Sequence, residues 1–381
     1  HRGLANKGYL VNAGLLEKYP DWFTPDVLPQ SMSGETMYDP KGRYYGACLS
    51  VFGVCANPDR LRLLQPSTEP SQWRELGEPR FQGSITFADP TKSGVVVTCL
   101  ERIIQQEMNF AHGASAAPVT PEELSRGWEE AWALVKRMSA NARFITDGAS
   151  RAARDIVKGD ASAGFAIDFH ARSEADWSAK ESGGEPRLVF HEPIGGTSVS
   201  ADPISLLRGA PNRELAKDFI AFVMSPEGQK LWNYKIGEPG GTTRYALRRL
   251  PIRRDAYTTE NRRHMSDPEV DPYKLAASFT YRREWTAPVY GLIAPLTKAV
   301  CLDALVECQA AWSAILRAGG PAKVPKAERA FRFLPVSYAD GKNVLAELNR
   351  DSVSRLKLLR EWTVVSREHF IEAKRLAEAG E

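Results

Sequence analysis

The chain has 381 residues, 43% of them apolar, which suits a globular protein of two domains or lobes. Its 50 lysine and arginine residues against 47 aspartate and glutamate residues give a net charge of +3, which excludes the large positive surplus of most nucleic-acid-binding proteins. The sequence lacks a run of about 20 apolar residues, so no transmembrane helix is predicted.

The first elements with a clear pattern are strands. Residues 42–58 are rich in aromatic and β-branched residues between turn formers, which predicts one or two strands. Residues 72–94 predict a short helix, a turn at Gly83, a strand over 84–88 and a polar loop.

A long helix is predicted over residues 119–142. Thr120 takes the N-cap position, Pro121 the first helical position, and Glu123 completes a capping box. One apolar stripe at helical spacing then consists of Leu124, Trp128, Trp132, Val135 and Met138.

The next segments continue the alternation of strands and helices. Residues 144–160 predict the end of a strand, a glycine turn and a helix, and residues 161–169 predict another strand. This order predicts an α/β fold with helices on both faces of a sheet. In such folds ligands bind at the carboxyl ends of strands and at the helix starts that follow them.

Residues 200–232 are strongly patterned although they contain no catalytic pair. Asn212 is a predicted N-cap, and Ser225 with Pro226 starts a second helix. The stripe of the first helix consists of Leu215, Phe219, Ile220, Phe222 and Val223. We interpret this segment as a packing element.

The same segment resembles the signature of bacterial extracellular solute-binding proteins of ABC transporters, in the iron- and organophosphate-type group. Four further segments resemble that family in the same order: 44–61, 83–94, 144–171 and 192–203. The similarity covers about residues 8–250, and its specificity lies in the ordered set of segments.

The resemblance implies a two-lobed periplasmic-binding (type II) architecture. Residues 1–55 would form an incomplete lobe one with a hinge strand, because the chain is expected to start after the family's first βαβ unit. Residues 56–196 would form lobe two. Residues 197–381 would return to lobe one and add C-terminal helices that pad it, and the basic segment 244–263 would be a solvated surface or a partner-docking site.

The resemblance also implies function. We expect no enzymatic activity and no cofactor, but capture of a small anionic solute and its delivery to an ABC transporter permease. The protein is expected to be periplasmic or extracellular and monomeric.

Two loops are predicted to hold the anionic group of the solute. Thr91, Ser93 and Gly94 lie between a strand and a helix, where hydroxyls and free backbone N–H groups can bind an anion. Ser150 and Arg151 lie at the next helix start and could bind an anion in the same way. The alternatives are an ordinary turn with a helix cap and two solvated arginines, Arg151 and Arg154.

The opposite end of the solute is assigned by the resemblance. In hexose-phosphate-binding relatives, acidic groups at matching positions hold sugar hydroxyls, which implies this role for Asp168 and Glu192, with His170 nearby. A sugar phosphate or another organophosphate is therefore the expected solute.

Metal binding is the alternative within the fold. Ferric relatives use adjacent tyrosines where this chain has Phe169 and His170, and Tyr44 and Tyr45 precede the hinge strand and would face opposite sides, so ferric iron is disfavoured. A divalent metal set could consist of Asp168, His170, His191 and Glu192.

A serine hydrolase is the alternative of another class. Residues 160–164 resemble the nucleophile elbow G-x-S-x-G, but Ser162 is predicted between a helix and a strand, the reverse of the order that the elbow needs. The cysteines form no CxxC pair and are expected to be mostly buried thiols: Cys48, Cys55, Cys99, Cys301 and Cys308.

Overall fold

The computed structural model describes residues 1–115 and 117–381. The chain forms two compact units. Unit 1 consists of His1–Val51 and Ser198–Tyr281, and unit 2 consists of Phe52–Thr197 and Arg282–Glu381. The predicted lobe two, residues 56–196, falls within the first segment of unit 2.

Unit 2 is built on a five-stranded sheet of order β7-β6-β8-β5-β9. Its strands are β5 (Phe52–Ala56), β6 (Ile85–Ala88), β7 (Ala142–Thr146), β8 (Ala163–Ile167) and β9 (Val189–His191). Strand β6 is parallel to β7 and β8, whereas β5 is antiparallel to both β8 and β9. Four strands, β6 to β9, therefore run in the same direction and end at one edge of the sheet.

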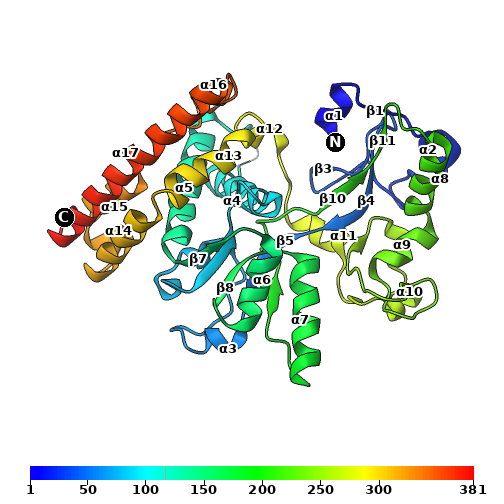
Figure 1. Cartoon of the computed structure of the whole chain (residues 1–381), viewed down its shortest axis with the longest axis horizontal. Coiled ribbons are helices and arrows are strands. Elements are labelled where there is room, and N and C mark those ends of the chain that lie inside the picture. Colours follow the sequence, from blue (N-terminus) through cyan, green and yellow to red (C-terminus); the bar gives the residue numbers. More distant parts are fainter. Residues whose placement is uncertain (116) are drawn as a thin grey trace. The chain divides into compact units, whose positions relative to one another are not determined.

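Helices cover both faces of this sheet (Figure 1). The main ones are α4 (Gly94–His112), α5 (Pro121–Ala140), α6 (Ala149–Lys158) and α7 (Asp168–Ser182), and shorter helices are α3 (Pro58–Leu61), η2 (Trp73–Gly77) and η3 (Pro79–Phe81). Because side chains alternate along a strand, Val54 and Phe165 share one core with α4 and α5, whereas Cys55 and Ala166 pack with α6 and α7. The predicted α/β class is confirmed.

Residues close together in the sequence predict the start and the buried side of α5 correctly. Thr120 Oγ1 accepts a hydrogen bond from the N–H of Glu123, and the Glu123 carboxylate accepts one from the N–H of Thr120, so the predicted capping box is confirmed. The tryptophans of the stripe, Trp128 and Trp132, are fully buried. The predicted turn at Gly83 is also found, with φ +66°, directly before β6.

The C-terminal segment corrects one prediction, because residues 282–381 belong to unit 2 and do not pad lobe one. Its Leu292 and Trp362 lie in the same hydrophobic core as Ile103 and Trp128. The pattern of an amphipathic helix says that one face is buried, but not which partner covers it. The helices are α12 (Arg283–Thr286), α13 (Tyr290–Thr297), η6 (Lys298–Leu302), α14 (Leu305–Arg317), η7 (Pro321–Lys323), α15 (Pro325–Arg332), α16 (Gly341–Leu348) and α17 (Ser352–Glu378).

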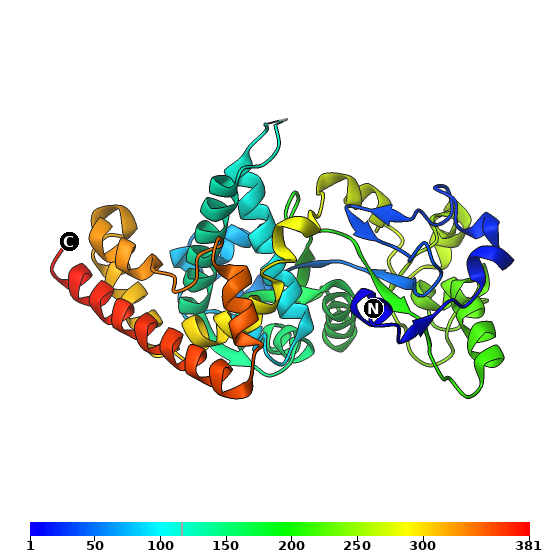
Figure 2. The ribbon, with the colours of Figure 1, turned by 90° about the horizontal axis from the view of Figure 1, so that it is seen from above.

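The long helix α17 lies along α14 and α15 (Figure 2). Among the described residues, no single helix is both long and apolar enough to span a bilayer, and only Tyr290–Leu302 together with Leu305–Arg317 reaches that length and composition, across a 65° bend. All five cysteines are buried and free, as expected. Cys301 and Cys308 lie in different helical segments, η6 and α14.

Unit 1 has smaller sheets. Its three-stranded sheet has the order β10-β4-β12, and two-stranded sheets pair β1 with β11 and β2 with β3. The strands are β1 (Leu10–Val11), β2 (Ser31–Met32), β3 (Glu35–Thr36), β4 (Tyr45–Ser50), β10 (Ser200–Ile204), β11 (Leu206–Leu207) and β12 (Leu250–Pro251). The predicted strand region 42–58 is thus two strands, with β4 in unit 1 and β5 in unit 2.

The helices of unit 1 are short. They are α1 (Arg2–Asn6), α2 (Leu15–Lys18), η1 (Pro20–Trp22), α8 (Arg213–Met224), α9 (Pro226–Asn233), η4 (Arg254–Ala256), α10 (Thr259–His264), α11 (Pro272–Leu275) and η5 (Ala276–Ser278). The predicted stripe of α8 is only half right. Ile220 and Val223 are buried, whereas Leu215, Phe219 and Phe222 are exposed.

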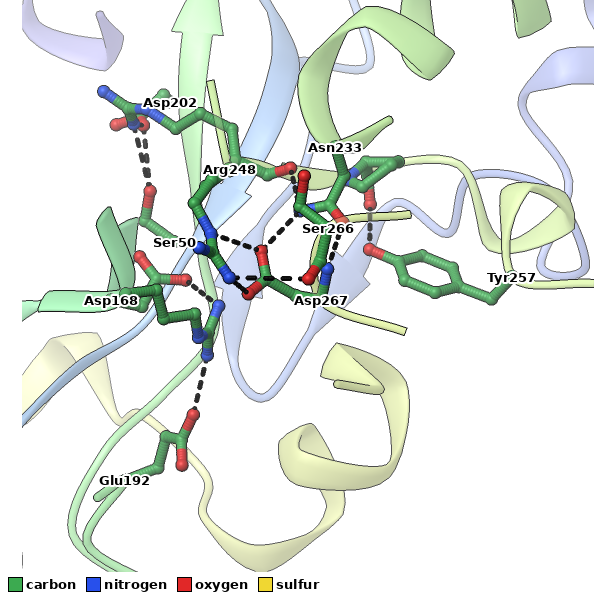
Figure 3. A network of polar contacts seen from close by, with 12 residues as sticks. Ser50, Asp168, Glu192, Asp202, Asn233, Arg248, Tyr257, Ser266 and Asp267 are labelled. Atoms are coloured by element: carbon green, nitrogen blue, oxygen red, sulfur yellow. Dashed lines mark hydrogen bonds and ion pairs between the residues drawn. The ribbon is translucent and has the colours of Figure 1, made fainter. Parts of the chain in front are cut away.

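The basic segment 244–263 is largely neutralised inside unit 1. Five of its arginines form ion pairs: Arg248 with Asp267, Arg249 with Asp202, Arg253 with Asp255, Arg262 with Asp271 and Arg263 with Glu260. Figure 3 shows Arg248 and Asp267 within a network that includes Asn233 and Ser266. Five of the seven arginines are therefore ion-paired within unit 1, whereas Arg244 and Arg254 are exposed, so the segment is a partly neutralised surface.

Candidate functional site

All the predicted site residues lie at one edge of the unit 2 sheet. Each follows a strand that ends at this edge: Thr91, Ser93 and Gly94 follow β6, Ser150 and Arg151 follow β7, Asp168 and His170 follow β8, and Glu192 follows β9. Neighbouring strands lie about 4.8 Å apart, so the loops after β7 and β8 are separated by roughly 10 Å. The topology thus gathers residues that the sequence spreads over about a hundred positions.

The loop after β6 is tied to the end of β7. The N–H of Asp89 donates to the carbonyl of Thr146 at 2.8 Å. The Asp89 carboxylate accepts hydrogen bonds from the N–H of Thr91 at 2.8 Å and from its hydroxyl at 2.7 Å. Since a hydroxyl has one proton, Thr91 cannot donate to an anion in this arrangement.

Ser93 is better placed for an anion. It is the N-cap residue of α4, makes no side-chain cap bond, and is followed by a first turn without acidic residues. The 19 residues of α4 direct the positive end of a helix dipole to this point. A Cβ atom added at Gly94 would meet no atom within 4 Å, so the space beside this turn is open.

The start of α6 has the same character. Gly148 is the N-cap residue, no side chain caps the helix, and its first turn carries no carboxylate. Ser150 is exposed. Arg151 is 65% exposed and lies 3.8 Å from Asp147 and 3.7 Å from Asp155, so its own unit supplies negative partners.

Asp168 and Glu192 are joined by an arginine that the sequence did not single out. Arg172 donates to Asp168 at 3.1 Å and to Glu192 at 2.8 Å (Figure 3). Asp168 is completely buried at the start of α7, and the Arg172 guanidinium lies over the Phe190 ring at 5.7 Å. The two carboxylates and the guanidinium form one group with a net charge of −1.

The divalent metal set is not assembled. His191 is paired with Glu69 at 2.9 Å, and the His170 ring lies 4.2 Å from the ring of Phe169. Over residues 1–115 and 117–381, no group of three or more histidine, cysteine, aspartate or glutamate side chains has the arrangement of a metal site.

The adjacent tyrosines are poor candidates for ferric iron. Tyr44 and Tyr45 lie in different hydrophobic clusters, as their alternation predicted. Burial raises the pKa of Tyr45 to about 12, which opposes the phenolate that iron needs.

Ser162 has no nucleophile elbow. Its backbone pairs with Ser84 and Asn57, and the residue is buried between the end of α6 and the start of β8. The order is helix, then strand, which confirms the reading from the sequence and leaves the serine without the exposed turn that a hydrolase uses.

Comparisons with known proteins identify relatives of this chain. An uncharacterised protein of Haemophilus influenzae is 26% identical over 222 residues, which cover 57% of this chain and 55% of that protein, so the match spans about half of this relative. The phosphoglycerate transport regulatory protein PgtC of Salmonella typhimurium is 24% identical over 337 residues, covering 86% of this chain and 71% of PgtC.

Solved structures show the same fold. A Bordetella parapertussis chain described as an extracellular solute-binding protein aligns with a TM-score of 0.52 and 14% identity, covering 78% of each chain. The family of bacterial extracellular solute-binding proteins matches residues 7–254, more than half of this sequence. The chain belongs to this family.

Proposed function

We propose that the protein captures a small phosphorylated solute, such as a sugar phosphate or another organophosphate, for an ABC importer. The observation that carries this proposal is the composition of one sheet edge in unit 2. Two uncapped helix starts, those of α4 and α6, face the same edge as the carboxylates of Asp168 and Glu192. Such an edge suits a ligand with an anionic end and a hydroxylated end.

The anionic end is assigned to the helix starts. Ser93 with Gly94 and Ser150 offer hydroxyls and free N–H groups where the helix dipoles favour negative charge. Thr91 supports this loop through Asp89, and Arg151 adds positive charge at its margin. Both therefore have a lesser role than the sequence predicted for them.

The hydroxylated end is assigned to Asp168 and Glu192. A carboxylate repels a phosphate but accepts strong hydrogen bonds from neutral hydroxyls. Arg172 holds both carboxylates in place, and it reduces the negative charge that the phosphate meets. His170 borders this group and stays a predicted contact.

A relative's name supports the chemical class. PgtC is named for phosphoglycerate transport, and its alignment covers most of this chain. The proposal extends to a periplasmic or extracellular location and to a transporter permease as the partner that receives the solute. A monomeric state stays a prediction.

Calorimetry with defined probes tests the proposal. Fructose 6-phosphate should bind, and neutral fructose should bind at least 10-fold more weakly. Ser150→Ala should weaken all phosphorylated probes alike, whereas Ser182→Ala, which changes an exposed serine at the end of α7, serves as the matched control. Equal affinity for fructose and fructose 6-phosphate would overturn the assignment.

A further inference from the structure

A cavity of about 550 Å³ opens beside the carboxyl end of β7 in unit 2. Three separate segments line it: the loop after β6, the end of β7 with the start of α6, and the turn that joins η6 to α14. The third segment comes from the C-terminal part of the chain, to which the sequence assigned only a packing role.

Each of these segments places one cation at the cavity. The cations are Lys92, Arg151 and Lys298. Three carboxylates, Asp89, Asp147 and Asp303, also line the cavity, so its formal charge is balanced.

The ion pairs at the cavity stay within single segments. Lys298 pairs with Asp303 at 2.6 Å, five residues along the chain, and Arg151 lies 3.8 Å from Asp147, four residues away. In the part of the chain that the structure describes, no ion pair crosses the cavity and Lys92 has no carboxylate partner. The three cations are therefore not joined by any negative group of the protein.

The backbone of the third segment explains why Lys298 faces the cavity. Pro295 lies inside α13 and lacks the N–H that would continue the helix ladder. The chain widens into a π-helix over Lys298–Leu302, a form often found at functional sites. Ala299, Val300 and Cys301 are completely buried, whereas the Lys298 side chain is 40% exposed. Core packing thus fixes the segment and leaves the lysine at the cavity.

We infer that Lys298 is a solute-binding residue that helps hold the anionic group of the ligand. This inference rests on the proposed function, because the cavity borders the start of α6, where the phosphate is assigned. A phosphate of charge about −1.5 to −2 could bridge Lys92, Arg151 and Lys298, which no single carboxylate of the cavity joins. From there, roughly 10 Å separates the end of β7 from that of β8, which Asp168 follows.

Variants of Lys298 and of its ion-pair partner Asp303 should change the affinity for phosphate in opposite directions. Asp303 competes with the phosphate for Lys298 and also repels the phosphate directly. Removing Lys298 should weaken binding, and neutralising Asp303 should strengthen it. A lysine with only a structural role would not give opposite effects for the two partners of one ion pair.

The test measures the Kd of the full chain for fructose 6-phosphate by calorimetry at low salt. Lys298→Gln should weaken binding roughly 3- to 10-fold, since the site is partly exposed, and Asp303→Asn should tighten it by a few-fold. Lys374→Gln is the matched control, because Lys374 is 46% exposed and ion-paired with Glu378 in the same unit. Thermal melting should show all three variants folded.

The possible results distinguish the proposed function from the role of Lys298. If the unmodified chain does not bind fructose 6-phosphate, the proposed function is wrong. If it binds this probe but Lys298→Gln changes the Kd no more than Lys374→Gln, or if Asp303→Asn weakens binding, the role of Lys298 is wrong while the proposed function stands.

Discussion

Lys136 provides a sharp test of the packing of unit 2. It lies within α5, its side chain is completely buried, and its ammonium donates to the carbonyls of Phe331 and Phe333 at the end of α15. Burial lowers the pKa of Lys136 from 10.5 to about 8. Lys136→Met removes the titrating group and keeps an unbranched side chain.

The expected effect follows from proton linkage. The folded chain binds the proton of Lys136 less tightly than the unfolded chain, so between pH 8 and 10.5 the unfolded state carries more protons. The free energy of unfolding of the unmodified chain, relative to Lys136→Met, should therefore rise with pH. A shift from 10.5 to about 8 predicts a gain on the order of 2 to 3 kcal/mol between pH 7 and pH 10.

Urea unfolding followed by tryptophan fluorescence at pH 7, 8, 9 and 10 measures this difference. Buried cysteines and tyrosines also titrate at alkaline pH, but they are common to both chains and largely cancel in the difference. Lys374→Met reports the general effect of losing one surface lysine. A difference that stays flat or falls from pH 7 to 10 would refute the account of Lys136.

Three further results are expected. Arg172→Met leaves the buried Asp168 without its ion-pair partner and should lower the free energy of unfolding in urea by about 3 kcal/mol. Adding Asp168→Asn to this variant should recover part of that free energy, and an equal loss in the single and the double variant would contradict the pairing. Asp168→Ala should weaken sugar phosphates by about 1.5 to 3 kcal/mol and inorganic phosphate by less in calorimetry, and unchanged affinity would remove its role. Ferric citrate should produce no charge-transfer band, and a band lost in Tyr45→Phe would reverse the argument from the pKa of that tyrosine.

The sequence predicted best what depends on neighbouring residues. The capping box at Thr120 and Glu123 sets the start of α5, and the two tryptophans one turn apart mark its buried side. The turn at Gly83 and the strand after it were equally local. These features depend on residues within a few positions of one another, so a single sequence contains them completely.

The sequence did not predict which element packs against the apolar face of each helix. The apolar face of α8 was predicted as one stripe, but of its five residues only Ile220 and Val223 are buried, while Leu215, Phe219 and Phe222 are exposed. The helices after residue 282 were expected to pad lobe one, and they pack into unit 2 instead. Helical periodicity can be seen in the sequence of one segment, whereas burial also depends on which other segment packs against it.

Arg172 shows how a small error in an element boundary hides an ion pair at the proposed site. The sequence predicted a strand through residue 169, but β8 ends at Ile167 and α7 begins at Asp168. On a strand, residues 168 and 172 would be separated by about 13 Å, whereas on a helix they are neighbours one turn apart. The same shift turns Asp168 from an isolated carboxylate into one end of an ion-pair group with Glu192. Under the proposed function, Arg172 compensates these charges, so the group can accept hydrogen bonds from hydroxyls beside a phosphate, and affinity should depend on the arginine as much as on either acid.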